Sequence, residues 1–201
     1  MIGTAQAAVF ELDFSNLGTF SGVAPSTTPV NAVYAKAIFQ DSGVDTVTLT
    51  MKVLPGILPA GAYVPEWYFN STTAPLNSIT HVSGDTASSV GNTPNTFKAD
   101  GIGGKFDILF KFPVSHPGQI GQGQQSVYTL TDTGLTANSF NSLSVPAPNG
   151  GGYLGAIKVQ GYGNSAWIAA APVPEPETYA MLLAGLGLVG FSARRRMNNN
   201  A

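Results

Sequence analysis

The chain contains 201 residues, has a formal net charge of −2 and has no cysteine. Without cysteine, it cannot supply a thiol nucleophile, a thiolate zinc site or the ligands of an iron–sulfur cluster. Between residues 8 and 171 six lysines stand against nine acidic residues, a net charge of −3, so nucleic acid is not an expected partner.

The start of the chain carries part of an export signal. Ala5-Gln6-Ala7 resembles the small-residue cleavage site of a secretory signal peptide, but residues 1–4 are too few to supply the basic and apolar regions that precede such a site. Two interpretations stay open: a chance match in an alanine-rich start, or a true start codon further upstream. We favour the second and interpret residues 1–7 as the remnant of a signal peptide.

Two segments show the two-residue periodicity of β-strands most clearly. Residues 44–53 alternate apolar and polar side chains, and residues 105–112 repeat the pattern. Such alternation is typical of a strand with one buried face, and we expect the second segment to be central to the core. The apolar residues are Val47, Leu49, Met51 and Val53 in the first segment, and Phe106, Ile108, Phe110 and Phe112 in the second.

Short apolar segments, separated by stretches rich in Gly, Pro, Asn and Ser, predict the remaining strands. Many short strands with no long amphipathic helix favour an all-β fold, a β-sandwich or jelly roll. We expect residues 8–171 to form this single exported domain. The further predicted strands are 9–14, 32–39, 66–70, 79–83, 126–131, 156–160 and 166–170.

Aromatic residues offer a candidate carbohydrate contact. Trp67, Tyr162 and Trp167 could present flat rings to a sugar. Trp67 and Trp167 both lie in predicted strands, however, where an aromatic side chain more often belongs to the core, and we favour that interpretation.

Few residues suggest catalysis or metal binding. His81 and His116 lie outside any triad or zinc pattern, and no two acidic residues are singled out by their spacing. The loop from Asp100 to Asp107 resembles a calcium loop in its glycines, but it has Ile102 where an acid would follow and adds Lys105. We therefore expect a turn there, no metal, no cofactor and no enzymatic activity.

The C-terminal region has three successive parts. Residues 172–177 form a Pro/Glu spacer, residues 178–193 are uncharged, and residues 194–201 begin with three arginines. A charged side chain at the bilayer centre costs roughly 2.5–3.5 kcal/mol, so the uncharged part is predicted to be a transmembrane helix with a cytoplasmic basic tail. Its anchoring side chains are Tyr179, Leu182, Leu183, Leu186, Leu188, Val189 and Phe191, and the basic stop is Arg194, Arg195 and Arg196.

The same uncharged run permits two other interpretations. It could be a buried helix of a soluble core, but a core helix is seldom apolar on all sides and followed by three arginines. It also contains glycines spaced as in a dinucleotide-binding loop, at 185, 187 and 190. Pro and Glu residues precede that run where such a loop requires a strand, so we regard the match as accidental.

The C-terminal region resembles the PEP-CTERM sorting signal of exopolysaccharide-producing Gram-negative bacteria. The resemblance lies in Val173, Pro174, Glu175, Pro176 and Glu177, followed by the apolar run and the arginine cluster. It implies recognition by an exosortase, a membrane cysteine protease that cuts near residues 174–176, and a transient anchor in the lipid bilayer. The domain is also similar to other PEP-CTERM cargo domains at residues 66–70, 97–101, 106–110, 134–137, 159–161 and 167–169.

These features lead to one expected function and two alternatives. We expect a noncatalytic protein that is exported across the inner membrane, anchored transiently, and delivered to the cell surface or biofilm matrix. A carbohydrate-binding module acting on exopolysaccharide is the first alternative, and a glycoside hydrolase built from dispersed acids is the second. An exposed cluster of Trp67, Tyr162 and Trp167 would favour the module, whereas a cleft with two acids about 5–9.5 Å apart would favour the hydrolase.

Overall fold

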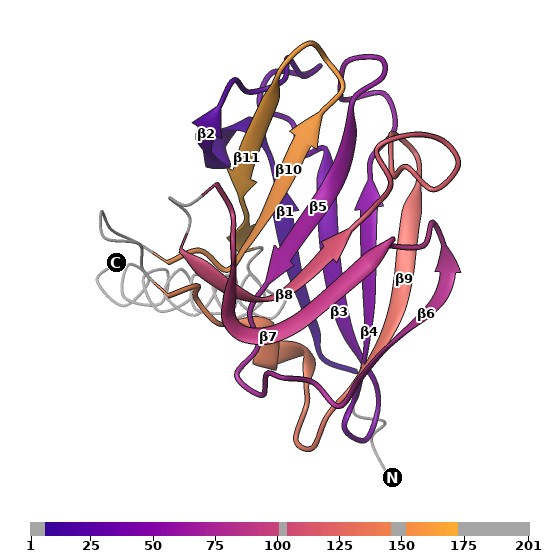
Figure 1. The fold of residues 1–201 in the computed structure, drawn as a ribbon, viewed down its shortest axis with the longest axis vertical. Helices are drawn as coiled ribbons and strands as arrows, with labels where there is room; N and C mark the ends of the chain where they lie inside the picture. The colour runs from indigo at the N-terminus through magenta and orange to yellow at the C-terminus, as the bar shows by residue number, and fades with distance from the viewer. Residues whose placement is uncertain (1–6, 101–103, 146–151, 173–201) are drawn as a thin grey trace, which may run out of the picture.

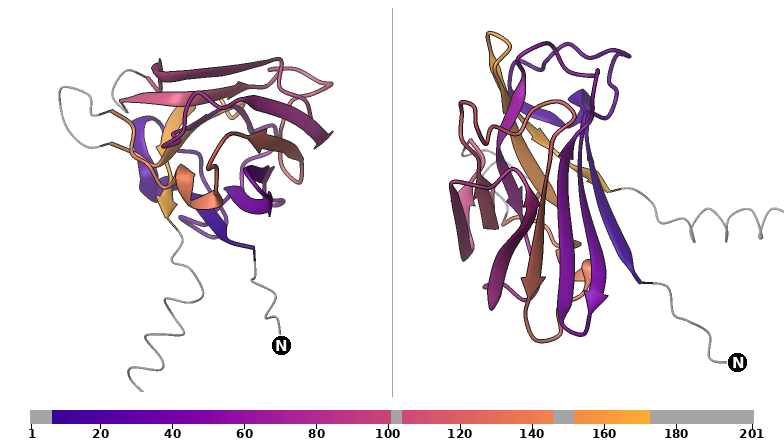
Figure 2. Two further views of the ribbon diagram at one scale, coloured as in Figure 1. Left: turned by 90° about the horizontal axis from the view of Figure 1, so that it is seen from below. Right: turned by 90° about the vertical axis from the view of Figure 1, so that its right-hand side faces the viewer.

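Figure 1 shows the computed structural model of the protein, which describes residues 7–100, 104–145 and 152–172. These residues form two six-stranded antiparallel sheets that lie face to face as two layers (Figure 2). The result confirms the predicted all-β class and is consistent with a β-sandwich. Two short 3-10 helices, η1 (Asn16–Gly18) and η2 (Ala137–Phe140), lie between strands.

The first sheet has the strand order β12-β1-β3-β4-β9-β6. Its strands are β1 (Val9–Phe14), β3 (Ala35–Gly43), β4 (Thr46–Val53), β6 (Ser78–Gly84), β9 (Gln125–Thr131) and β12 (Ala171–Pro172). The second sheet has the order β2-β11-β10-β5-β8-β7. Its strands are β2 (Thr19–Gly22), β5 (Tyr63–Phe69), β7 (Ser89–Lys98), β8 (Lys105–Lys111), β10 (Gly155–Gln160) and β11 (Ser165–Ala169).

All nine predicted strands are present, and β1 has the predicted bounds. Three strands were not predicted: β2, β7 and β12. Strand β7 has Gly91 and Pro94 in its interior and is exposed or half-buried along its length. It lies at the edge of its sheet, where a proline interrupts fewer hydrogen bonds, and its register with β8 shifts between Asn92 and Phe97. An edge strand of this kind has no alternating pattern by which it could be predicted.

The main core lies between the two sheets and is rich in aromatic rings. On β4, the four alternating apolar side chains are buried as predicted. Phe39 stacks on Phe140 with ring centroids 4.0 Å apart and meets Phe69 edge-on at 5.2 Å. These contacts join β3 of the first sheet, β5 of the second and η2, so side chains from both sheets interdigitate over one apolar interior.

A second, smaller cluster covers the opposite face of the second sheet. It contains Tyr68, Phe106, Leu109 and Ala156, whereas Trp67 and Phe69 belong to the main core. Neighbouring residues of a strand point to opposite faces, so the cluster with Tyr68 lies outside the sandwich. This corrects one detail of the prediction. Phe106 is buried, but it packs in this outer cluster and not with Ile108, Phe110 and Phe112.

Within the residues that the structure describes, no helix has the length and apolar character needed to cross a membrane. The predicted transmembrane helix 178–193 and basic tail 194–201 lie outside the described residues, as do residues 173–177 of the spacer and residues 1–6 of the predicted signal remnant.

Tyr34 places a hydroxyl group in the main core without a hydrogen-bond partner among the described residues. Burial raises the pKa of this hydroxyl, with a smaller contribution from Tyr162. In the unfolded chain tyrosine ionises near pH 10. The stability that neutral Tyr34 provides is therefore fully present below about pH 10 and is lost as the pH rises above it, because only the unfolded state then releases its proton.

The variant Tyr34→Phe is expected to be more stable than the wild type at pH 7. Its free energy of unfolding should be about 1 kcal/mol higher, since the substitution removes an unpartnered buried hydroxyl. It should also lose less stability than the wild type between pH 9 and pH 11. Urea unfolding of both proteins at pH 7, 9 and 11 measures the two effects. If the wild type and the variant lose the same free energy of unfolding between pH 9 and pH 11, the role given to Tyr34 is wrong.

Candidate functional site

The edge of the first sheet is where the described part of the chain meets the Pro/Glu spacer. The chain crosses from the second sheet to the first at Ala170, whose backbone N–H donates to the carbonyl of Gly155 at 2.9 Å. Strand β12 then pairs with β1, with Ala171 opposite Asp13 and Pro172 opposite Leu12. Pro172, assigned above to the spacer, is therefore part of the sheet.

The two sides of β1 can be told apart from its pairing with β3. The N–H of Asp41 donates to the carbonyl of Ala8 at 3.0 Å, and the register continues through Val9 opposite Gln40. Because hydrogen-bonded positions alternate along an antiparallel pair, even-numbered residues of β1 direct their backbone groups to β3. Odd-numbered residues direct theirs to the outer edge, so the pair of Asp13 with Ala171 is the hydrogen-bonded one.

Side-chain charges beside this edge neutralise one another in part. Lys36 on β3 forms an ion pair with Asp13 at 2.9 Å and a closer one with Glu11. Burial lowers the pKa of Lys36, but hydrogen bonds and charge from the two carboxylates outweigh burial and leave the pKa raised. One ammonium group therefore lies between two carboxylates, Glu11 and Asp13.

A surface pocket of about 370 Å³ lies next to the same edge. Phe20 of β2 and Tyr153 line it, and their rings are stacked with centroids 5.0 Å apart and 19° between planes. Asp13, Ser15 and Thr19 also contribute to its wall. Asp13 is the one acidic residue in that lining, so this pocket does not hold the pair of acids that the hydrolase interpretation requires.

The structure separates the three aromatic residues considered as a sugar platform. Trp67 is fully buried in the main core, where its ring meets Phe14 edge-on at 5.6 Å. Trp167 is half-buried on the other face of the sheet, with the Lys158 ammonium 4.6 Å from its ring centre. Both tryptophans pair with β10, but with successive residues, Ile157 and Lys158, which point to opposite faces.

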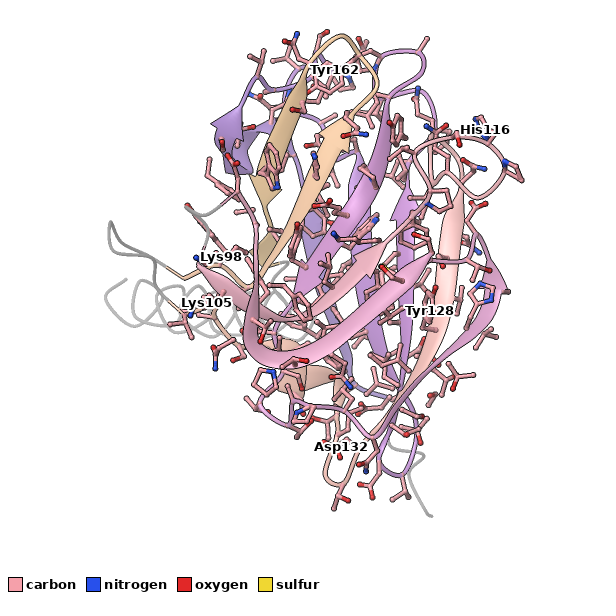
Figure 3. All side chains as sticks on the ribbon, in the orientation of Figure 1. Lys98, Lys105, His116, Tyr128, Asp132 and Tyr162 are labelled. Carbon is pink, nitrogen blue, oxygen red and sulfur yellow. The ribbon has the colours of Figure 1, made fainter. Side chains whose placement is uncertain are left out.

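Tyr162 lies at the tip of the β10–β11 hairpin, as Figure 3 shows, whereas both tryptophans lie within strands. Its hydroxyl donates to the carbonyl of Val23 at 2.6 Å. The platform built on Trp67, Tyr162 and Trp167 is therefore wrong as a single surface. The physical reason is register: a shift of one residue along a strand moves a side chain to the opposite face.

The other residues considered as functional have local partners. His81 of β6 meets the ring of Tyr128 at 5.2 Å, and His116 is exposed on the loop between β8 and β9. Asp107 accepts hydrogen bonds from the backbone N–H groups of Ser71 and Asn95, at 3.1 and 2.7 Å, and the hydroxyl of Ser21 donates to Asp100. Among the described residues, no three His, Asp or Glu side chains gather in a way that could hold a metal ion.

Calcium is expected to leave the melting temperature of the domain unchanged after chelator treatment, because Asp100 and Asp107 bond to different parts of the fold. Thermal unfolding with and without excess calcium measures this directly. A ligand that binds only the native state at 100 times its Kd stabilises by about 2.7 kcal/mol. A clear rise in melting temperature would therefore show that the native domain binds calcium, contrary to this prediction.

Comparison with known proteins identifies the segment that follows the sheet edge. The model of the PEP-CTERM protein-sorting motif matches residues 172–196. The chain carries a PEP-CTERM protein-sorting motif. No curated protein and no solved structure matches the chain. The PEP-CTERM motif implies export, transient membrane anchoring and processing by an exosortase in a Gram-negative bacterium, and hence an exosortase-targeted cell-surface protein.

One residue joins the folded domain to the PEP-CTERM motif. Pro172 is the last residue of β12 and also the first residue of the matched segment. The sequence alone showed the motif but not its attachment, because a two-residue strand of alanine and proline carries no periodic signal. The pairing of the motif's first residue with β1 is thus a finding of the structure.

Proposed function

We propose that this protein is a noncatalytic component of the cell surface or biofilm matrix, delivered there by an exosortase that removes its C-terminal tail. The observation that carries the proposal is the position of the PEP-CTERM motif. A cut near residues 174–176 falls after Pro172, the last residue of the last described strand. The released product would therefore keep both sheets complete.

The acidic side chains support the noncatalytic part of the proposal, because several of them hold backbone in place. Asp41 accepts from the N–H of Ala137 at 2.6 Å, and Asp45 accepts from the N–H of Gly134 at 2.9 Å. Asp41 and Asp45 hold the segment that follows β9, and Asp107 holds the N–H of Ser71 after β5 and of Asn95 within β7. Hydrogen bonds to the backbone are sufficient to explain these carboxylates, so a role in binding a substrate is not needed.

Mass spectrometry of surface material tests the proposal in cells that contain the exosortase and in cells from which it is deleted. Cells with the enzyme should release a product that lacks Arg194–Arg196, and deleted cells should retain the full chain in their membranes. An intact C-terminus on the surface protein in both strains would overturn the proposal.

A second candidate function, exopolysaccharide binding, is favoured by the pocket at Phe20 and Tyr153. Aromatic rings beside hydroxyl and carboxylate groups suit a sugar, which presents both apolar faces and hydroxyl groups. Tyr153→Ala should then migrate faster than wild type in a gel that contains the polysaccharide, whereas Tyr162→Ala should be retarded like wild type. Equal retardation of all three proteins would exclude this pocket.

A further inference from the structure

Strand β12 is the shortest strand in the described sheets, and it lies at an edge. It contains one hydrogen-bonded pair, Asp13 with Ala171, and one pair without direct hydrogen bonds, Leu12 with Pro172. So short a pairing contributes little to stability, so we expect β12 to be among the first parts of the fold to open. The PEP-CTERM motif begins within this strand.

The prolines of the motif fit the edge of β1 beyond the residues already paired. Pro172, Pro174 and Pro176 occupy alternate positions. Continued in the same register, Val173 would lie opposite Glu11 and Glu175 opposite Val9. These odd-numbered positions are the ones that direct backbone groups toward β1, whereas the prolines, which have no N–H group, take the positions that need none.

The outer edge of β1 has backbone groups that such a segment could pair with. Val9 and Glu11 direct their N–H and C=O groups to the outer edge, and within the described residues no strand pairs with them on that side. An open edge of this kind is a template for an extended segment. The motif continues directly from Pro172, which already lies on this edge, so it is the occupant that we assign to it.

We propose that the outer edge of β1, residues Val9–Asp13, holds the start of the PEP-CTERM motif in a docked state, and that processing requires the motif to leave this edge, which in the natural chain happens when β12 detaches. This inference rests on the proposed exosortase processing. Enzymes that cut peptides commonly bind them extended, through the same backbone groups that a sheet edge uses. The docked motif therefore has those groups occupied, and the released motif has them free.

Few residues connect the folded domain to the predicted membrane segment, so release of the motif changes how far the domain can lie from the membrane. Six residues, 173–178, separate Pro172 from Tyr179, the first anchoring side chain of the uncharged run. Fully extended they reach roughly 20 Å, so the folded domain stays close to the bilayer and to a membrane enzyme even when all six are free. The docked motif holds residues 173–175 along β1 and leaves three residues before Tyr179. Release of the motif together with β12 frees residues 171–175, which adds roughly 17 Å of reach.

A reversible lock tests the proposal on the full chain. Asp13→Cys combined with Ala171→Cys places two thiols on the paired positions. The Cα atoms of a hydrogen-bonded pair are about 5.5 Å apart, within the range for a disulfide. The chain has no cysteine of its own, so the two new thiols can pair only with each other within one molecule. Pulse-chase labelling in exosortase-containing cells should show processing of the wild type, no processing of the oxidised double variant, and recovery on reduction.

Two controls separate a lock from a damaged fold. Each single cysteine variant should be processed like the wild type. A six-residue Gly/Ser insertion after Pro172 in the locked protein should restore processing, because it frees the motif while β12 stays fixed. If the oxidised protein is processed as fast as the wild type, the docked state has no bearing on cleavage and the proposal fails. If the wild type itself is not processed, the proposed function fails instead.

A second series changes the pairing without a cross-link. Ala171→Pro removes the N–H that faces β1 and should speed processing about fivefold, since a backbone hydrogen bond contributes about 1 kcal/mol net. Ala171→Val, with its higher strand propensity, should slow processing, and Ala171→Ser keeps the N–H and serves as the matched control. Equal rates in all three variants would overturn the proposal.

Discussion

Replacement of Pro174-Glu175-Pro176 by three alanines is expected to abolish release of the protein from exosortase-containing cells. The substitution removes the residues at which the motif is cut but leaves the uncharged run 178–193 unchanged, so insertion into the membrane should persist. Full-length protein should therefore accumulate in the membrane fraction. Immunoblots of membrane and released fractions, followed by mass spectrometry of the C-terminus, measure the change.

Two controls accompany this variant. Thr178→Ala changes the first residue of the uncharged run, directly after the Pro/Glu spacer, and it should be processed normally. Replacement of Arg194–Arg196 should disturb retention or orientation, because it removes the positive charge that keeps this end cytoplasmic. Release of a shortened product from the triple-alanine variant would show that the cut does not depend on these residues.

Phe110→Ala is expected to have the largest effect on the stability of the folded domain. Phe110 is fully buried and packs against Tyr128 and Phe69, with ring centroids 4.8 and 6.2 Å away. Truncation removes contacts with rings from both sheets and leaves a cavity, which typically costs about 3–5 kcal/mol. Since single domains are stable by about 5–15 kcal/mol, this loss would remove a substantial part of the fold's stability.

Urea unfolding of residues 8–172, which include β12, measures this cost. Val114→Ala is the matched control, because Val114 is 61% exposed and neighbours the same strand. Its effect should stay within about 0.5 kcal/mol. A similar small effect for Phe110→Ala would mean that the interior is not packed around this ring.

Strands with one buried face were predictable because their side chains alternate along the sequence. The strand at residues 46–53 follows this rule, whereas the strand at residues 105–111 lies where expected but is buried on both faces from Phe106 to Phe110. The position of a side chain relative to those on neighbouring strands was not predictable from this alternation. Whether Trp67 and Trp167 share a face depends on their register against β10, and Phe106 belongs to the outer cluster although its alternation matches that of Ile108.

The candidate site also has a part that the sequence predicts and a part that it does not. The PEP-CTERM motif is a local pattern of residue types, so the sequence was sufficient to find it. Its contact with the domain joins Pro172 to Leu12, 160 positions away along the chain, and depends on how the whole sandwich closes. The pocket at Phe20 and Tyr153 likewise combines distant segments, which no local pattern brings together.

The pairing of the chain's first strands with its last ones determines when folding can finish. Strand β2 finds its described partner in β11, and β1 receives its outer neighbour from β12. Contacts between such distant residues form slowly and late. During N-to-C emergence the sandwich cannot close before residues 165–172 arrive, and these immediately precede the rest of the sorting motif. A prematurely terminated chain would lack β11 and β12, leave β2 without its described partner and remain open to proteolysis, so the fold itself favours survival of those molecules that have also made their sorting signal.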